Sequence, residues 1–346
     1  MNLYTNAGWI DTSLYFRDNA APLVVAIGGR GTGKTYGILS ELIRRNEFFL
    51  MLRRQQSQLD ALLSEQLNPF ADYNRDHQDT IIPARIKGNK YLIGFYRGEP
   101  DDEGNLKPAG ACLAMGAALS TFAGIRGLSG RDIKTVFFDE VIPEARERPI
   151  RDEEGAILNL YESINRNREL LGERPLRLIM ATNSNNFKSR VLNAFGLLDD
   201  VEQMIRRHKS YRRTRAGAEI YNYWDSPISA RKAGTFLYQA GKNDSFNRMS
   251  LANEFPDDDF EGVQPQPLQE YRPLVTIGDL TVYQHASDRR YYVVAGKKAE
   301  RRYTLLPNSK IAFRSDFVEL YDALISGDLS YSTVRVKMEF EDIWRG

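Results

Sequence analysis

Apolar and polar residues alternate along the first two-thirds of the chain in a pattern that predicts strands separated by helices. Short apolar runs, typical of buried strands, occur at residues 23–27, 48–53, 91–96, 111–115, 135–138 and 176–181. Apolar residues recur at helical spacing in residues 34–45, 56–67 and 153–168. Because strands that alternate with helices form mainly parallel sheets, we predict an α/β fold for this part of the chain.

The composition changes toward the C-terminus. Residues 256–273 contain four prolines, a run of three aspartates and few apolar residues, which is typical of a linker. Beyond it, apolar patterns predict strands at 274–277, 280–284 and 291–294 and helices at 317–325 and 336–344. We therefore expect a large α/β domain over residues 1–255 and a small α+β domain over residues 274–346. Residues 197–255 are candidates for a lid segment of the larger domain.

A phosphate-binding motif follows the first predicted strand. Residues 28–35 read Gly-Gly-Arg-Gly-Thr-Gly-Lys-Thr, a complete Gly-x-x-x-x-Gly-Lys-Thr motif between a strand and a helix. In this order, backbone N–H groups and the helix N-terminus face phosphate oxygens, Lys34 reaches the β- and γ-phosphates, and Thr35 ligates Mg²⁺. The alternative is a glycine-rich turn that binds no nucleotide. We predict a site for ATP and Mg²⁺ formed by Gly28, Gly29, Arg30, Gly31, Thr32, Gly33, Lys34, Thr35 and Tyr36.

A second motif turns nucleotide binding into hydrolysis. Residues 135–140 read Thr-Val-Phe-Phe-Asp-Glu, an apolar strand that ends in two carboxylates. In phosphate-loop enzymes, an aspartate at this position holds Mg²⁺, as we expect of Asp139. Glu140, directly after it, can accept a proton from the attacking water. The alternative is that both acids merely cap the strand. The adjacent glutamate favours a motor-type ATPase over a small-molecule kinase.

Three further polar residues are candidates for contacts with the transferred phosphate. Asn183 follows the strand at 176–181 and is placed to contact the γ-phosphate or the attacking water; the alternative is a local turn. Arg166 and Arg168 close the predicted helix before that strand. Such arginines either interact with the helix dipole or reach into a neighbouring subunit's site as a finger. Arg126 lies between glycines in the loop before the Asp-Glu strand, which by itself indicates only a mobile loop that carries a cation.

Together these motifs resemble, in their order, those of viral DNA-packaging motors. The chain is similar to the packaging ATPases of phi29-like phages, which are relatives of the terminase large subunits. The resemblance is carried by the phosphate loop, the glycine-flanked Arg126, and the Phe-Phe-Asp-Glu, Arg-Asn-Arg-Glu and Ala-Thr-Asn segments. Arg53 and Arg54 after the second strand, residues 248–255 and residues 320–329 also resemble that family.

The resemblance implies a phosphate-loop NTPase of the additional-strand, catalytic-glutamate type. It also implies a homomeric ring, expected to have five subunits, docked on the portal of an empty capsid. ATP hydrolysis would drive double-stranded DNA through the ring, in the host cell cytoplasm and transiently on the viral procapsid. Arg166 matches the family's trans-acting finger, with Arg168 as the second candidate. Arg126 stands where we expect a lysine. Whether a structural RNA mediates docking stays open.

Two basic segments are candidates for contact with the DNA backbone. Residues 206–215 carry six Lys or Arg and no acid, and residues 289–314 carry eight against the single acid Glu300. Such runs are typical of sequence-independent phosphate contact, which a motor for any genome needs. The alternatives are solvated loops, a face toward the portal or an RNA, and, for the first run, a lid over the nucleotide. The candidate residues are Arg206, Arg207, Lys209, Arg212, Arg213, Arg289, Arg290, Lys297 and Lys298.

Composition limits the remaining classes of function. The net charge of +1 excludes a basic coat over the whole surface. A single cysteine, Cys112, excludes an internal disulfide and fits a reducing compartment. No apolar run reaches the roughly 18 residues of a membrane helix, so we expect no membrane partner and an intracellular protein.

The C-terminal region raises the main competing activity. Terminase large subunits carry there an RNase H-like nuclease, which needs a cluster of carboxylates for two metals. Here the aspartates are scattered, and none lies in the middle of a predicted strand. We expect a vestigial nuclease fold that serves in docking or DNA contact, with an active nuclease as the alternative. Two competing functions concern the whole chain: a helicase-like or plasmid-partition ring ATPase, and a nucleotide-gated module that does not hydrolyse ATP.

Overall fold

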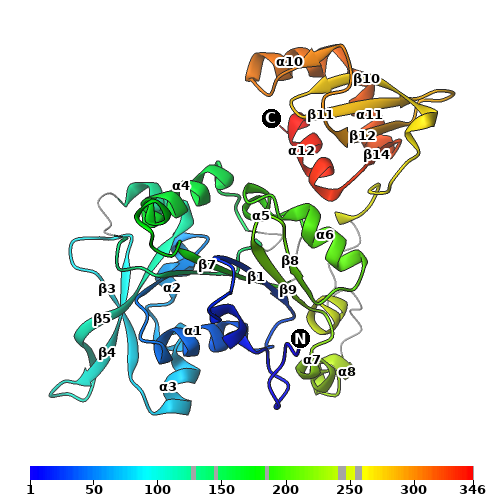
Figure 1. Cartoon of the computed structure of the whole chain (residues 1–346). Helices are drawn as coiled ribbons and strands as arrows, with labels where there is room; N and C mark the ends of the chain where they lie inside the picture. The colour runs from blue at the N-terminus through cyan, green and yellow to red at the C-terminus, as the bar shows by residue number, and fades with distance from the viewer. Residues whose placement is uncertain (126–129, 144–146, 184–186, 241–246, 254–258, 346) are drawn as a thin grey trace. The chain divides into compact units, whose positions relative to one another are not determined.

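The computed structural model describes residues 1–125, 130–143, 147–183, 187–240, 247–253 and 259–345 (Figure 1). The chain forms two compact units. The N-terminal unit contains residues 1–195 and 204–255, and the C-terminal unit contains residues 196–203 and 256–346. Among the residues that the structure describes, every helix is too short or too polar to span a bilayer.

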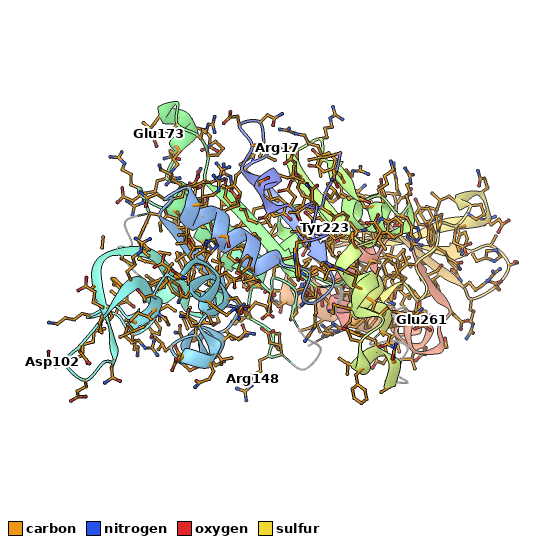
Figure 2. The ribbon with its side chains drawn as sticks, turned by 90° about the horizontal axis from the view of Figure 1, so that it is seen from below. Arg17, Asp102, Arg148, Glu173, Tyr223 and Glu261 are labelled. Carbon is orange, nitrogen blue, oxygen red and sulfur yellow. The ribbon has the colours of Figure 1, made fainter. Side chains whose placement is uncertain are left out.

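The N-terminal unit is built on a nine-stranded sheet with the order β3-β4-β5-β2-β6-β7-β1-β9-β8. The strands are β1 (Leu23–Gly28), β2 (Phe49–Arg53), β3 (Ile81–Arg85), β4 (Ile93–Pro100), β5 (Leu106–Ala118), β6 (Thr135–Asp139), β7 (Arg177–Thr182), β8 (Tyr211–Arg213) and β9 (Ala218–Tyr223). The strands from β5 to β9 in this order are all parallel. β3, β4 and β8 are antiparallel to their neighbours. Asp102 marks the tip of the hairpin that joins β4 to β5 (Figure 2).

Helices cover both faces of this sheet, which explains why its central strands are almost entirely apolar. The helices of the N-terminal unit are α1 (Lys34–Arg44), α2 (Gln56–Ala61), α3 (Ala71–His77), α4 (Glu153–Asn165), α5 (Arg190–Ala194), α7 (Pro227–Lys232) and α8 (Phe236–Ala240), whereas α6 (Leu198–Arg206) spans the boundary between the two units. Figure 1 shows α1 and α3 beneath the sheet and α4 and α5 above it. Ile38 and Leu42 of α1 pack with Val24, Ala26 and Phe137 of the sheet in one hydrophobic core.

The strand order places the predicted motifs at one edge of the sheet. β7 lies between β1 and β6, which is the additional-strand arrangement that the family resemblance implies. Because β1, β6 and β7 are parallel, the residues that follow them meet at their carboxyl ends, where ligands bind in open α/β sheets. The phosphate loop, Asp139 and Asn183 are therefore neighbours. β9 completes the other side of β1, and the sequence pattern did not predict it.

The C-terminal unit contains a five-stranded sheet with the order β13-β10-β11-β12-β14. Its strands are β10 (Tyr271–Ile277), β11 (Leu280–His285), β12 (Tyr291–Ala295), β13 (Arg302–Tyr303) and β14 (Leu329–Tyr331), and its helices are α10 (Pro307–Asp316), α11 (Val318–Ser326) and α12 (Val334–Trp344). β10, β11 and β12 form an antiparallel meander, and the two short strands run parallel to their neighbours. The unit is therefore α+β. Its assignment as an RNase H-like fold stays a prediction.

Two boundaries differ from those predicted. The linker predicted to end at residue 273 overlaps β10, which begins at Tyr271. Pro273 is tolerated in this strand because β13 pairs only with Thr276 and Ile277, so the missing N–H of proline breaks no hydrogen bond on that side. Residues 196–203 group with the C-terminal unit, although the lid predicted for the larger domain begins at residue 197. There Glu202 accepts a hydrogen bond from the backbone N–H of Val334 at 2.8 Å, at the start of α12.

Two predicted helices are also too long. The helix predicted at 56–67 is α2, which ends at Ala61 and is followed by the short turn η2 (Glu65–Leu67). The helix predicted at 153–168 ends at Asn165, because Arg166 adopts the left-handed backbone conformation with φ of 45°. A second short turn, η4 (Arg168–Leu171), follows it.

Candidate nucleotide site

The phosphate loop adopts a backbone that its glycines permit. Gly31 and Gly33 have φ of 67° and 93°, in the left-handed region that favours glycine. Gly29 has a second constraint, because a Cβ at this position would lie 2.6 Å from the backbone oxygen of Ser250. Residues 30–36 line a pocket of about 930 Å³, so most of the residues predicted to bind the nucleotide lie around one cavity.

Lys34 is the centre of the hydrogen bonding in this pocket. Its ammonium group donates to the backbone oxygens of Gly28 (2.6 Å) and Gly29 (2.9 Å) and to Oδ1 of Asn183 (3.0 Å). The side chain is 8% exposed. Burial lowers the pKa of Lys34 from its ordinary 10.5 to about 7, against the opposing effect of the nearby Asp139 carboxylate. All three acceptors are neutral, so a phosphate oxygen would be a stronger partner for this ammonium.

Thr35 and Asp139 form the pair expected to hold the metal. The Thr35 hydroxyl donates to Asp139 Oδ1 and Oδ2 at 3.1 and 3.2 Å, and Asp139 is 5% exposed. Mg²⁺ is commonly bound by one or two protein carboxylates, with water and phosphate oxygens completing its octahedron. A hydroxyl beside one buried carboxylate, next to a phosphate loop, fits this pattern.

Arg53 connects the two acids at the end of β6. Its guanidinium lies 3.0 Å from Asp139 Oδ2 and 2.9 Å from Glu140 Oε2. Arg53 ends β2, which pairs with β6, so the sheet brings the arginine to the acids. The sequence motifs gave Arg53 no role at the site. The available signal was its place directly after a buried strand, which is too general to identify a partner. Arg53 fixes the direction of the Glu140 carboxylate.

Arg54, the next residue, anchors the start of α4. Its buried guanidinium pairs with Glu153 in the first turn of α4 and donates to Glu147 Oε1 (2.8 Å) and to the backbone oxygen of Val141 (3.2 Å). Burial raises the pKa of Glu153, and the Arg54 charge opposes that rise. The end of β6 is therefore tied to the helix that leads to Arg166.

The pocket extends beyond the phosphate loop to a part of the chain that no motif marked. Residues 9–13 and Asp72, Arg75 and Asp76 of α3 also line it. Trp9 is 45% exposed, and a Cβ on Gly33 would lie 3.2 Å from its ring. The backbone N–H of Ile10 donates to the Thr32 oxygen at 3.4 Å. This lobe provides space for the nucleoside part of a nucleotide.

The comparisons with known proteins identify the family and the fold of the chain. Residues 10–267 match the family model described as Podovirus DNA encapsidation protein (Gp16). The chain belongs to this family. No curated protein matches the chain.

Two solved structures share the fold of this Gp16-family chain over nearly its whole length. The first is the genome packaging motor assembly of bacteriophage Phi-29, with a TM-score of 0.65 and 19% identity over 99% of each chain. The second is the Phi-28 gp11 DNA packaging motor, with a TM-score of 0.59 and 17% identity over 97% of this chain and 96% of that chain.

The two arginines that were candidates for a finger have different environments. Arg168 is 7% exposed, and its guanidinium donates to the backbone oxygens of Gly130 (2.9 Å), Arg131 (3.1 Å) and Ile133 (2.7 Å). It therefore has a structural role here, and any action on a neighbouring subunit would break these bonds. Arg166 is exposed and donates from Nε to the Ser163 oxygen at 3.2 Å.

Arg166 lies near the amino end of β7, whereas the phosphate loop follows the carboxyl end of the parallel strand β1. The preceding residue, Asn165, accepts a hydrogen bond from Leu176 N–H at 2.8 Å, directly before β7 begins. The phosphate loop follows the end of β1, which is parallel to β7. A strand of this length spans roughly 20 Å, so Arg166 does not serve the nucleotide site of its own subunit.

Arg126, the third candidate, lies outside the described residues. The residue before it, Ile125, lines a shallow hollow together with Phe122, Ser163 and Arg166.

The candidate DNA-binding residues are divided between the two units. In the N-terminal unit, Arg206 is the last residue of α6, Arg207 and Lys209 lie between α6 and β8, and Arg212 and Arg213 lie on β8, the edge strand of the sheet. In the C-terminal unit, Arg289 and Arg290 lie in the β11–β12 turn, whereas Lys297 and Lys298 follow β12 at the other end of the sheet. There, Gly296 N–H donates to the Asp279 oxygen at 2.6 Å. Residues 289–314 are one basic run in the sequence, but an antiparallel strand separates its parts.

No group of three or more His, Cys, Asp or Glu side chains that could hold a metal occurs among the residues that the structure describes. A two-metal nuclease centre therefore has no counterpart in the described part of the C-terminal unit.

Replacing Arg168 and Arg166 with alanine should affect stability to different extents. We expect Arg168→Ala to lower the free energy of unfolding of the N-terminal unit by about 3 kcal/mol, because the buried carbonyls of Gly130 and Ile133 and the part-buried carbonyl of Arg131 lose a charged donor. Arg166→Ala should change it by less than about 0.5 kcal/mol, since the side chain is exposed. Urea unfolding followed by circular dichroism measures both, and equal effects would contradict the two roles.

The low pKa of Lys34 predicts how stability depends on pH. Without nucleotide, the unfolded chain binds more protons than the folded chain between pH of about 7 and the ordinary pKa of 10.5. The folded state should therefore gain stability as the pH rises through this window. Lys34→Met removes the titrating group, so the stability of the unmodified protein relative to this variant should increase with pH. A difference that stays constant from pH 7 to 10 would show that Lys34 keeps its ordinary pKa.

Proposed function

We propose that this chain is an ATP-hydrolysing motor that moves double-stranded viral DNA into a preformed capsid through its portal. The observation that carries the proposal is the convergence of Lys34, Thr35, Asp139, Glu140 and Asn183 at one edge of the sheet. Membership of the Gp16 family supports the packaging role. The site supplies the chemistry, and the family supplies the substrate that the motor moves.

Each residue of the site has a role that its position supports. Lys34 exchanges its neutral acceptors for the β- and γ-phosphate oxygens of ATP. Thr35 and Asp139 would hold Mg²⁺, which would supply positive charge to neutralise the phosphates. Glu140 accepts the proton of the attacking water, and Asn183 lies close enough to Lys34 to contact the terminal phosphate.

We further propose that the motor is a homomeric ring in which Arg166 acts on the site of a neighbour; the number of five subunits rests on the resemblance to the packaging ATPases alone. The position of Arg166 at the far end of the parallel strands supports the ring, since an arginine there reaches phosphate only in another copy. A finger of this kind stabilises charge on the transferred phosphoryl group and couples hydrolysis in one subunit to the position of the next. The ring would assemble in the host cytoplasm and dock on the procapsid portal, with or without a structural RNA.

The basic segments are the proposed contacts with DNA. Some of these residues lie in and after α6 and on β8, and the others lie at the two ends of β12. In this proposal they contact the duplex at several points. Contacts of this kind to phosphates are independent of sequence. The C-terminal unit serves, in this proposal, as a docking and DNA-contact module.

The trans role of Arg166 can be tested by mixing two inactive variants in the presence of double-stranded DNA. Arg166→Ala subunits keep Glu140, and Glu140→Gln subunits keep Arg166. Each alone should hydrolyse ATP at least about 100-fold more slowly than the unmodified protein, because each lacks one group that acts in the transition state. In the mixture, an intact arginine lies beside an intact glutamate, and turnover should return.

The measurement is steady-state phosphate release across protein concentration. Turnover per subunit of the unmodified protein should rise with concentration as rings form. Arg174→Ala, which removes an exposed arginine from the loop after η4, is the matched control and should keep full activity. Turnover that is independent of both concentration and Arg166 would contradict the ring.

A further inference from the structure

A segment far along the chain packs directly on the phosphate loop. The backbone oxygen of Ser250 lies so close to Gly29 that only glycine fits there. Nδ2 of Asn253 donates to the backbone oxygen of Ile27 at 3.3 Å, at the end of β1. Both residues belong to the N-terminal unit, as does α7. The loop is therefore covered by residues that no nucleotide-binding motif includes.

Lys232, the last residue of α7, carries a charge to this loop. Its Nζ donates to the backbone oxygen of Arg30 at 2.5 Å, and a Cβ on Gly31 would lie 3.5 Å from it. The ring of Tyr238 is its other neighbour, at 5.4 Å from Nζ to the centroid. Among the described residues, no carboxylate forms an ion pair with Lys232. The ammonium group is thus bound by a neutral oxygen and an aromatic ring.

Lys34 and Lys232 share this environment from two sides of the loop. Lys34 donates to the oxygens of Gly28 and Gly29, and Lys232 donates to the oxygen of Arg30, the next residue. Two ammonium groups on one loop repel each other, and an anion that contacts both would remove that repulsion.

A buried hydroxyl on the same face of α7 has no hydrogen-bond partner among the described residues. Ser229 lies one turn before Lys232, and residues at this spacing share a helix face. It is 3% exposed, its Oγ would lie 3.4 Å from a Cβ on Gly29, and it has no hydrogen-bond partner among the described residues. Buried hydroxyls usually have one. The contact between α7 and the loop therefore has hydrogen bonds to gain if the helix shifts.

We infer that Lys232 is a second phosphate-binding residue, which contacts the terminal phosphate of a nucleoside triphosphate from the side of α7. The inference rests on the proposed function, because it adds a residue to the same site. Lys34 enters the loop from the start of α1, whereas Lys232 reaches it from a segment about 200 residues later in the chain. Contact with the terminal phosphate would exchange the Arg30 oxygen for a charged acceptor.

This role makes Lys232 a residue that distinguishes a triphosphate from a diphosphate. Loss of the terminal phosphate would return Lys232 to a neutral oxygen, so the position of α7 would follow the state of the nucleotide. Because Lys232 lies outside the phosphate-loop motif, its removal should leave binding of a diphosphate largely intact. That difference is what an experiment can measure.

The test is isothermal titration calorimetry of the full chain with Mg²⁺ and either ADP or a non-hydrolysable ATP analogue. Lys232→Met removes the charge and keeps an aliphatic stem beside Tyr238. We expect affinity for the analogue to fall about tenfold and affinity for ADP to fall less than about twofold, as one lost charge-assisted hydrogen bond predicts. Lys232→Arg should recover most of the loss. Lys87→Ala, which removes an exposed lysine from a turn, is the control for net charge.

Two outcomes would overturn the inference, and a further variant separates it from the proposed function. If Lys232→Met leaves both affinities unchanged, or lowers both equally, Lys232 does not contact the terminal phosphate. Thermal unfolding of each variant shows whether an equal loss reflects damage to the fold. Lys34→Ala should weaken both nucleotides. If it binds them as the unmodified protein does, the proposed site itself is wrong, whatever Lys232 shows.

Discussion

The buried ammonium group of Lys34 is the constraint on which the rest of the site depends. Taking a charge out of water is unfavourable unless polar partners surround it. Here these partners are two loop oxygens and Asn183, so the loop, the end of β7 and the start of α1 must meet at one point. The strand order satisfies this requirement, because β7 lies directly beside β1. The apolar sheet thus positions the Lys34 ammonium group, which can exchange its neutral acceptors for a charged phosphate oxygen.

The groups proposed to act on the subunit's own nucleotide and the arginine proposed to act on a neighbour's lie at opposite ends of the parallel strands. The carboxyl ends of the strands carry the phosphate loop, Asp139 and Glu140, and the opposite edge carries Arg166. Arg53 and Arg54, adjacent in sequence, connect these parts: Arg53 holds the acids, and Arg54 holds the start of the helix that ends at Arg166. The residue that pairs with the two acids is therefore directly next in sequence to the residue that anchors the start of α4. This arrangement suits a machine in which neighbouring subunits depend on each other.

Sequence patterns predicted those parts of the structure that local chemistry determines. The strands β1, β6 and β7 and the loop after β1 follow from short apolar runs and a motif of fixed spacing. β9 was missed because it contains Glu219 and Asn222, although the whole strand is buried. Glu219 is satisfied by the Tyr211 hydroxyl at 2.8 Å and by Arg17 at 3.3 Å, both distant in sequence or on another element. The sequence also could not predict that Lys232 and residues 9–13 lie beside the phosphate loop, because only the tertiary fold brings these distant segments to it.

The measurement that tests the central claim most directly compares ATP binding with ATP hydrolysis for Glu140→Gln and the unmodified protein. Glutamine keeps the size of the side chain and removes its ability to accept a proton. The account predicts that both proteins bind ATP with similar affinity, while the variant hydrolyses it at least about 100-fold more slowly. Equal rates of hydrolysis by the two proteins would contradict it, because the acid at the end of β6 would then have no part in the reaction.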